Sequence, residues 1–355
     1  MNKRIDYLVR KLIGTHSLSE GEYRELIELR DKESSLTLQK EAVRLRKEIY
    51  GHKVFIRGLI EVSNICKSDC YYCGIRKSNK NCDRYRLSKE DILSCCKDGY
   101  ALGFRTFVMQ GGEDGFFSDA FLCDVISEIK NLYPDCAVTL SLGERSRESY
   151  EKLFKAGADR YLLRHETADE EHYSRLHPEN LTLRNRMECL RNLKEIGFQT
   201  GCGFMVGSPF QNTECIAEDL KFIEEFEPEM VGIGPFIPHK DTPFGNYPPG
   251  SAELTCFLLS VIRIIHPSVL LPSTTALGTL EDGGREKGIL HGANVIMPNL
   301  SPTDVRDKYM LYNNKLSTGA ESAQKLEELK KKIDSIGYSI VTERGDIIKK
   351  STERK

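Results

Sequence analysis

Residues 61–86 read EVSNICKSDCYYCGIRKSNKNCDRYR, and they join the end of an apolar run to three closely spaced cysteines. The run over Val54–Val62 is short, apolar and rich in β-branched residues, as in a buried strand. Cys66, Cys70 and Cys73 follow it with CxxxCxxC spacing. Because α/β proteins place their sites beyond the C-terminal ends of parallel strands, the stretch predicts a strand and a candidate metal site together.

From this stretch onward, short apolar runs alternate with helical runs. The expected strands are Val54–Val62, Arg105–Gln110, Ala137–Leu142, Arg160–Arg164, Thr200–Val206, Met230–Gly234, Val269–Thr274 and Ala293–Met297. The expected helices are Lys89–Leu102, Ala120–Leu132, Arg147–Ala156, Leu183–Ile196, Glu214–Phe226 and Ala252–Ile264. Strand–helix alternation requires parallel pairing with crossover helices, and eight units predict a closed α/β (βα)8 TIM barrel. A doubly wound open sheet is the alternative, although no GxGxxG motif follows the first strand.

The segments outside this alternation are expected to be helical. In residues 1–51, Ser19 and Glu22 fit a capping box and Gly51 fits a helix stop, which predicts an N-terminal helical extension packed on the barrel. Residues 52–300 are expected to form the barrel. Residues 301–355 are expected to hold one more helix, Glu321–Ile336, and a polar tail.

Composition narrows the possible functions of the 355-residue chain. Its 51 Lys and Arg against 53 Asp and Glu give a net charge of −2, so we expect no nucleic-acid partner. No apolar run approaches the ~20 residues needed to cross a bilayer, and Met1–Arg10 lacks a signal-peptide core. We therefore expect a cytoplasmic protein without a membrane partner. Twelve cysteines in such a chain favour metal or redox chemistry over disulfides.

Two metal sites are compatible with three thiolates this close in sequence. A structural zinc needs four protein ligands, and Cys82 could be the fourth. A 4Fe–4S cluster held by only three cysteines leaves one iron open for the amino and carboxylate groups of S-adenosylmethionine (SAM). One electron from the cluster then breaks a carbon–sulfur bond of SAM and yields a 5′-deoxyadenosyl radical. The spacing and the place after the first strand favour the cluster. The other cysteines are more simply explained as small packing residues.

The CxxxCxxC motif after the first strand resembles the radical SAM superfamily, and further motifs are similar to the HydE-type maturases of FeFe hydrogenase. The matching stretches are RYRLSKEDI, VMQGGED, VTLSLGE, AGADRYLLRHETA, MVGIGPFIPHKDTP, LPSTTALGT, GGRE and GANVIMPN, between about Val54 and Tyr312. The resemblance implies reductive SAM cleavage in hydrogenase active-site (H-cluster) assembly, with a contribution to the dithiolate bridge. It also implies a small-molecule or iron-synthon substrate, sister maturases, and a reductant such as ferredoxin.

The resemblance also implies which residues contact SAM. They are Tyr72, Gln110, Gly112, Glu113, Thr139, Ser141, Glu166 and Arg186. Several have a physical reading of their own. Gly112 and Glu113 follow the second strand, where a glycine allows close approach and an acid can bind an ammonium group. Thr139 and Ser141 lie two apart and so share one side of a strand.

The substrate cavity is expected to be lined by residues at other strand ends. They are Arg160, Arg164, Met230, Thr274, Thr275 and Met297. Arg160 and Arg164 are four apart, face the same way on a strand, and suit bidentate binding of a carboxylate. An internal ion pair between Arg164 and Glu166 is the structural alternative. We interpret Met205, together with His165, His239 and His291, as structural rather than catalytic.

One departure from the family pattern concerns a second cluster that some members bind near the C-terminus. The YxxY stretch is present at Tyr309–Tyr312, but Ser317 occupies a possible ligand position and no cysteine follows Cys256. We therefore expect no second C-terminal cluster. Three rivals stay open: a methylornithine-synthase-like mutase, a non-catalytic zinc-binding protein, and a biotin-synthase-like sulfur inserter. The last needs a sacrificial cluster inside the barrel, for which Cys136 and Cys202 are too few.

Overall fold

A closed ring of parallel strands forms the centre of the computed structural model, which describes residues 3–316 and 322–348. One sheet has the order β2 (Gly58–Ser63), β3 (Thr106–Gly111), β4 (Ala137–Ser141), β5 (Arg160–Leu162), β6 (Gln199–Cys202), β8 (Met230–Val231). Single parallel bridges join Met230 to Leu270 and Pro272 to Val295, and β10 (Val295–Ile296) pairs with β1 (Lys53–Ile56). Because β1 continues into β2, the ring closes over eight positions, and the predicted barrel is confirmed.

Several predicted strands are divided or shortened. Val54–Val62 breaks at Arg57, because β1 pairs with β10 and with β11 (Ser339–Val341), whereas β2 pairs with β3. Thr200–Val206 divides into β6 and β7 (Met205–Val206), and β7 pairs with β9 (Gly234–Pro235). Val269–Thr274 forms only isolated bridges, and Pro272 within it has no N–H for a ladder.

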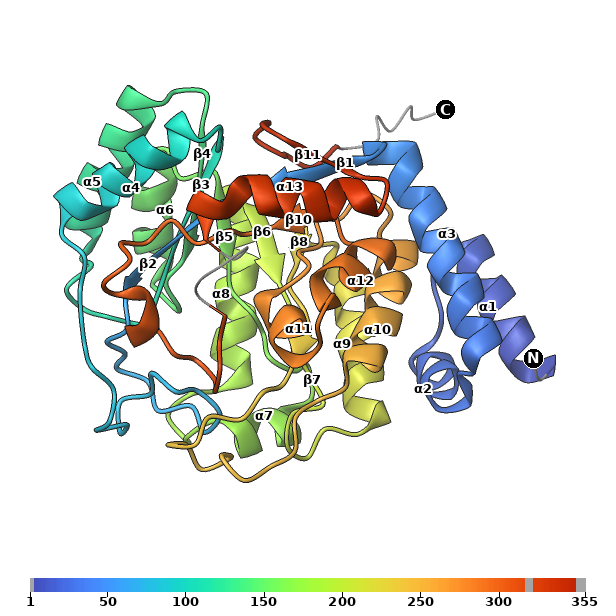
Figure 1. Ribbon diagram of the computed structural model, residues 1–355. Coiled ribbons are helices and arrows are strands. Elements are labelled where there is room, and N and C mark those ends of the chain that lie inside the picture. Colours follow the sequence, from blue (N-terminus) through green and yellow to red (C-terminus); the bar gives the residue numbers. More distant parts are fainter. Residues whose placement is uncertain (1–2, 317–321, 349–355) are drawn as a thin grey trace.

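Helices surround the ring, and those that the sequence predicted begin and end within one residue of their predicted bounds (Figure 1). The predicted helices are α4 (Lys89–Ala101), α5 (Asp119–Leu132), α6 (Arg147–Lys155), α8 (Leu183–Ile196), α9 (Thr213–Phe226) and α10 (Ala252–Ile265). The short helices α7 (Glu170–Leu176), α11 (Thr275–Leu280) and α12 (Gly284–Leu290) were not predicted. Hydroxyl side chains cap many of them; Ser88, for example, accepts a hydrogen bond from the backbone N–H of Asp91. These local signals explain why the helix bounds were readable from the sequence.

The N-terminal helices α1 (Lys3–Thr15), α2 (Glu20–Leu29) and α3 (Lys32–Tyr50) pack beside the barrel. α2 lies against α9 and α3 against α10. The Ser19–Glu22 capping box is present, and Gly51 ends α3 with φ +60°. The Tyr23 hydroxyl donates a 2.6 Å hydrogen bond to Glu224 of α9. The extension therefore covers outer helices and leaves the mouth of the barrel open.

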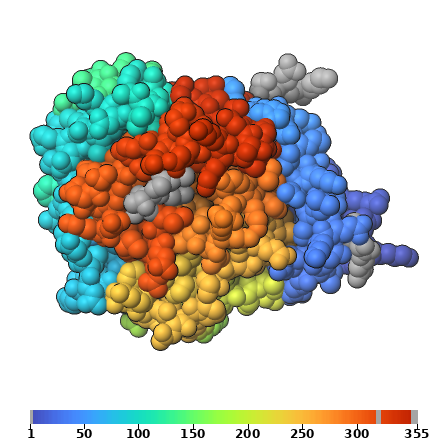
Figure 2. Space-filling model, in the orientation of Figure 1, coloured from blue at the N-terminus to red at the C-terminus, as the bar shows by residue number. Residues whose placement is uncertain are grey.

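The C-terminal segment runs back over the outside of the barrel. It contains η1 (Arg306–Lys308), η3 (Ala323–Lys325), α13 (Leu326–Ser335) and β11. Figure 2 shows this part of the chain, deep orange to red, covering the middle of the face toward the reader. The predicted helix Glu321–Ile336 is shorter in the structure, and Glu321, Ser317 and the tail 349–355 lie outside the described residues. Among the described helices, none combines the length and apolar character that a membrane crossing requires.

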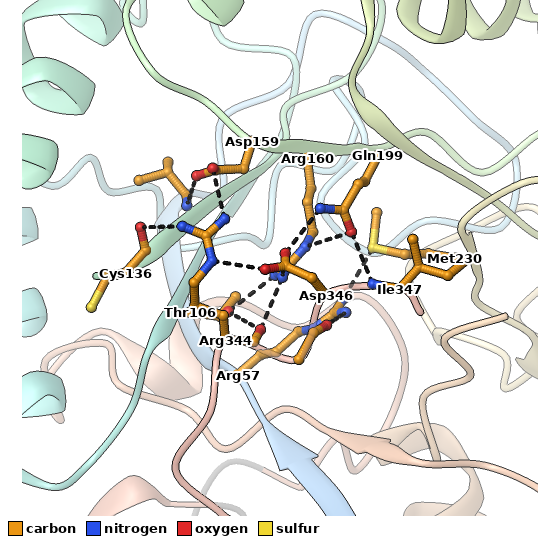
Figure 3. A network of polar contacts seen from close by, with 12 residues as sticks. Arg57, Thr106, Cys136, Asp159, Arg160, Gln199, Met230, Arg344, Asp346 and Ile347 are labelled. Carbon is orange, nitrogen blue, oxygen red and sulfur yellow. Dashed lines mark hydrogen bonds and ion pairs between the residues drawn. The ribbon is translucent and has the colours of Figure 1, made fainter. Parts of the chain in front are cut away.

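A network of charged side chains that contains Arg160 fills the end of the barrel opposite Cys66, Cys70 and Cys73 (Figure 3). Arg160 is fully buried and donates hydrogen bonds to Asp346 (2.6 Å) and to the Thr106 hydroxyl (3.0 Å). Arg344 binds Asp346 and Asp159. Arg160 begins β5, about 13 Å of extended chain before Arg164, so the two residues occupy opposite ends of the barrel. Contrary to the sequence-based expectation, Arg160 does not line the substrate cavity.

We expect Asp346→Ala to lower the free energy of unfolding by about 2 kcal/mol at pH 7, because it leaves the buried Arg160 without its carboxylate partner. The value is below the ~3–5 kcal/mol of a fully buried pair, since Asp346 is 39% exposed. Burial alone would raise the pKa of Asp346, but Arg344 and Arg160 lower it below its usual value. The stabilisation is therefore present above about pH 4 and lost as the pH falls through the lower, folded-state pKa.

Urea unfolding of the wild type and the variant between pH 3 and 7 tests this prediction. Glu343→Ala is the matched control, because the exposed pair of Glu343 and Lys53 should change stability by less than about 0.5 kcal/mol. Equal stabilities of the Asp346→Ala variant and the wild type at pH 7 would contradict the assigned role of the network.

Candidate functional site

A cavity of about 340 Å³ lies at the mouth of the barrel, beyond the C-terminal ends of the strands. The mouth loops 64–86 and 236–250 lie at the bottom of Figure 1, whereas β1 and β11 lie at the top. Most of the predicted site residues line this cavity: Cys66, Cys70, Tyr72, Cys73, Gln110, Gly112, Glu113, Ser141, Arg164, Glu166, Arg186, Thr274, Thr275 and Met297. Three predicted residues do not line it: Thr139, Arg160 and Met230.

The three cysteines are held by a loop that is ordered through its own polar groups. The Arg84 guanidinium donates to the carbonyls of Ile75 (2.8 Å) and Arg76 (2.7 Å). Asp69 accepts from Arg76 (2.8 Å) and from the Ser78 hydroxyl (2.7 Å). These contacts fold residues 66–84 into a compact turn that presents the thiols to the cavity.

Burial makes the three cysteines weak acids in the absence of a bound cation. It raises the pKa of Cys66, raises that of Cys70 to about 12, and raises that of Cys73 well above its usual value. The Sγ of Cys66 accepts a hydrogen bond from the backbone N–H of Glu113 (3.3 Å). Cationic iron would reverse the penalty on the thiolates, so this donor set suits a metal centre.

The thiols of Cys66, Cys70 and Cys73 line one cavity, and the described residues place no fourth cysteine there. Within residues 3–316 and 322–348, no three Cys, His, Asp or Glu side chains converge on one metal ion. A 4Fe–4S cluster requires no such convergence, because each cysteine binds a different iron. Cys82, the candidate fourth zinc ligand, does not line the cavity, and its Sγ lies 3.5 Å from the Asn64 amide. The residues present therefore fit a cluster held by three cysteines.

The glycines after β3 and β4 bring backbone close to the cysteine loop and to Glu113. A Cβ on Gly112 would lie 2.2 Å from the carbonyl oxygen of Ile65 and 2.8 Å from Cβ of Cys66. A Cβ on Gly143 would lie 2.1 Å from Cγ of Glu113, whose carboxylate accepts from the backbone N–H of Glu144 (3.2 Å). These contacts fix the Glu113 carboxylate at the wall of the cavity.

Glu166 lies in a strained turn, and its side chain lines the cavity. It has φ +70°, a left-handed conformation that costs a non-glycine residue on the order of 1 kcal/mol. Asp219 on α9 binds both ends of this turn, since its Oδ1 accepts from His165 (3.0 Å) and from the backbone N–H of Ala168 (2.7 Å). Nδ1 of His165 in turn accepts from the backbone N–H of Gly203 (3.2 Å). Burial lowers the pKa of His165 to about 3, so the ring is neutral and donates to Asp219 through Nε2.

Two further side chains on this wall have defined partners. Arg186 of α8 binds the Glu144 carboxylate and donates to the carbonyl of Arg164 (2.6 Å). The Tyr72 hydroxyl lies 3.1 Å from Nε2 of His177. Nδ1 of His177 donates to the carbonyl of Tyr173 (3.0 Å), and burial lowers the pKa of His177 to about 3. Nε2 is therefore the acceptor and Tyr72 the donor.

Of the residues expected to line the substrate cavity, some line the mouth cavity and others do not. Arg164 lies 2.9 Å from the Glu166 carboxylate, so the ion pair considered as the structural alternative is present. The buried Thr274 hydroxyl has no hydrogen-bond partner among the described residues, so its hydrogen-bonding capacity is free for a bound ligand. Met230 instead packs deeper, where its sulfur lies 3.0 Å from Arg57. Thr139 shares its strand face with Ser141 but lies one layer below it.

Several residues that line the cavity were not predicted from the sequence to do so. They are Glu61, Ser68, Met205, Tyr309, Tyr312 and Lys315. The Tyr309–Tyr312 stretch is noted in the sequence only as a marker for a second cluster. Met205, expected as core, both packs against Phe236 and lines the cavity. Cys136 and Cys202 are buried and do not line the cavity, so neither is placed to hold the sacrificial cluster that the sulfur-inserter alternative needs.

Comparisons with known proteins agree with this geometry. Residues 60–223 match the model of the radical SAM superfamily. The chain is 43% identical over 314 residues to the FeFe hydrogenase maturase subunit HydE of Thermotoga maritima, covering 88% of this chain and 89% of that protein. It is 26% identical over 339 residues to 3-methylornithine synthase of Methanosarcina acetivorans, covering 94% and 91%.

A solved structure shows the same fold. The crystal structure of methylornithine synthase matches with a TM-score of 0.83 at 24% identity, over 94% of this chain and 97% of that one. This likeness concerns the fold alone, whereas the 43% identity over most of both chains identifies the family. The chain belongs to the radical SAM superfamily and, within it, to the family of HydE-type FeFe-hydrogenase maturases.

Proposed function

We propose that this protein is a radical SAM enzyme that reductively cleaves SAM during assembly of the FeFe-hydrogenase active site, contributing to the dithiolate bridge. The observation that carries the proposal is the mouth cavity in which Cys66, Cys70 and Cys73 meet Glu113 and Glu166. The 43% identity to a HydE maturase supports this function over other radical SAM reactions.

Cys66, Cys70 and Cys73 would hold one 4Fe–4S cluster with an open iron. The cluster, when bound, supplies the electron that breaks a carbon–sulfur bond of SAM. The chain's own residues bind and orient the cofactor. Glu113 is placed to accept hydrogen bonds from the SAM ammonium, and the Gly112 backbone allows close approach. Tyr72, Gln110, Ser141, Glu166 and Arg186 would complete the SAM site, whereas Thr139, expected there from the sequence, does not line the cavity.

We expect Glu166→Gln to weaken SAM binding about tenfold, because the variant removes a carboxylate that the strained turn holds at the cavity. Anaerobic equilibrium dialysis with radiolabelled SAM measures the change. Glu170→Gln is the control, since Glu170 is exposed on α7 and faces no cavity. Unchanged affinity in Glu166→Gln would remove Glu166 from the SAM site.

The remaining assignments follow from the chemistry of the site and the family. We propose a small-molecule or iron-synthon substrate at Arg164, Thr274, Thr275 and Met297, with sister maturases as partners and a low-potential reductant such as ferredoxin. We propose no second C-terminal cluster, because no cysteine follows Cys256. We place the reaction in the cytoplasm, where the twelve free thiols stay reduced.

Reconstitution tests the proposed function. The purified protein, with its cluster reconstituted anaerobically, is added to an extract that contains apo-hydrogenase and the two other maturases but lacks this protein. We expect SAM-dependent restoration of hydrogenase activity. SAM cleavage without restored activity would favour the methylornithine-synthase-like mutase. A protein that carries zinc and no sulfide would favour the non-catalytic alternative.

A further inference from the structure

A buried ion pair joins the first barrel strand to the C-terminal segment inside the mouth cavity. Glu61 of β2 is fully buried, and only 6% of the Lys315 side chain is exposed. Lys315 Nζ donates to Glu61 Oε1 at 2.7 Å, and both residues line the cavity. This pair lies outside the residue set assigned to the cluster and to SAM.

The Glu61 carboxylate is fully satisfied without any ligand. Its second oxygen accepts from the Asn299 amide (2.9 Å), and Asn299 accepts in turn from the backbone N–H of Ser301 (2.8 Å). The Glu61 backbone N–H donates to the Ser301 hydroxyl (2.8 Å). Glu61 is therefore a fixed anchor for Lys315.

The ammonium group of Lys315 keeps hydrogen-bonding capacity that the described residues do not use. It has three N–H donors, and Glu61 is its one hydrogen-bond acceptor within residues 3–316 and 322–348. The Tyr309 ring lies on another side, with its centroid 5.3 Å from Nζ. Burying an ammonium group whose N–H donors lack acceptors costs free energy. A buried ion pair also stabilises the contact between two segments no better than an apolar contact does. The remaining donors suit an acceptor in the cavity.

The free N–H donors of Lys315 lie close to the proposed SAM site. The Tyr309 hydroxyl accepts from Gln110 (3.3 Å), which lies in the proposed SAM wall. Tyr309 and Lys315 line the same cavity as Cys66 and Cys73. An anion held by Lys315 would therefore place the rest of a small molecule beside the site of radical formation.

We propose that Lys315 is a substrate-binding residue that holds a carboxylate of the substrate, while Glu61 and Tyr309 orient its ammonium group. This inference rests on the proposed function and extends it to the chemical class of the substrate. An ammonium is a compact, strongly hydrated point charge, so its burial costs free energy unless anions surround it. Glu61 and a substrate carboxylate would together give the Lys315 ammonium two anionic partners.

Lys315→Met tests the proposal, because methionine keeps the length of the side chain and removes the charge. Hydrogenase activation is measured while the low-molecular-weight fraction of an anaerobic extract containing the other maturases is titrated. We expect the half-saturating amount of this fraction to rise at least about tenfold, with an unchanged affinity for SAM and unchanged cluster content. Lys315→Arg should restore part of the loss.

Two further variants separate substrate binding from a structural role. Lys325→Met is the control, because Lys325 forms an exposed pair with Glu328 in the same C-terminal segment. In the double variant Glu61→Gln/Lys315→Met, no unpaired charge is left buried, so folding and SAM binding should be normal while half-saturation stays raised.

Three outcomes would overturn the inference: wild-type half-saturation in Lys315→Met, loss of SAM binding in that variant, or recovery of half-saturation in the double variant. Failure of the wild-type protein itself to activate hydrogenase would instead contradict the proposed function.

Discussion

Replacing Cys66, Cys70 and Cys73 together with alanine is expected to remove iron and sulfide from the protein and to lower 5′-deoxyadenosine formation to the level without enzyme. The three thiols line one cavity, and the described residues provide no other cysteine there. Burial disfavours their charged forms until a cationic centre binds. Iron and sulfide analysis after anaerobic reconstitution, followed by quantification of 5′-deoxyadenosine with dithionite and SAM, measures both effects.

Cys82→Ala is the control for this experiment. Cys82 lies in the same sequence segment but does not line the cavity, so its loss should leave iron content and SAM cleavage near wild type. Circular dichroism checks that the triple variant retains its helices. Wild-type rates of SAM cleavage in the triple variant would show that these cysteines do not hold the reactive centre.

Gly112→Ala is expected to give the second largest effect, a severalfold loss of cluster content and a matching loss of SAM cleavage. The new Cβ would lie 2.2 Å from the Ile65 carbonyl oxygen and 2.8 Å from Cβ of Cys66. Neither neighbour is the far end of a flexible side chain, so the loop that carries the cysteines has to move. Overpacking of this kind costs about 1–3 kcal/mol, here concentrated on a metal-binding loop.

Gly115→Ala is a matched control, three residues further along the same loop. A Cβ at Gly115 meets nothing within 4 Å, so this variant should resemble the wild type in iron content, SAM binding and thermal stability. If Gly112→Ala assembled the cluster as well as Gly115→Ala does, close packing between Gly112 and the cysteine loop would not be needed for the site.

The eight-unit fold was predictable because its signals are local. Most residues of the barrel strands are buried, so the strands appear as short apolar runs, and most of the predicted helices begin at a side chain that caps them. α8 occupies the predicted residues Leu183–Ile196. The break at Arg57 was not predictable, because it reflects a change of partner strands from β10 and β11 to β3. Pairing partners distant in sequence leave no local signal.

Site residues were predicted correctly where a motif lies at the end of a strand. The prediction failed for residues whose place in the site depends on how deep they lie in the barrel. Periodicity correctly places Thr139 and Ser141 on one strand face, yet only Ser141 reaches the cavity. Arg160 and Met230 also do not line the cavity, because a two-residue period fixes the side of a strand and not the position of a side chain along the barrel axis. The pair of Glu61 and Lys315 spans 254 residues and has no motif that could reveal it.

The central claim is that three cysteines hold a cluster with one iron open to SAM, and electron paramagnetic resonance of the anaerobically reduced protein tests it most directly. We predict about four irons and four sulfides per chain, and a reduced-cluster signal whose g values shift when SAM is added. A signal that SAM leaves unchanged, from a protein with full iron and sulfide content, would contradict the claim.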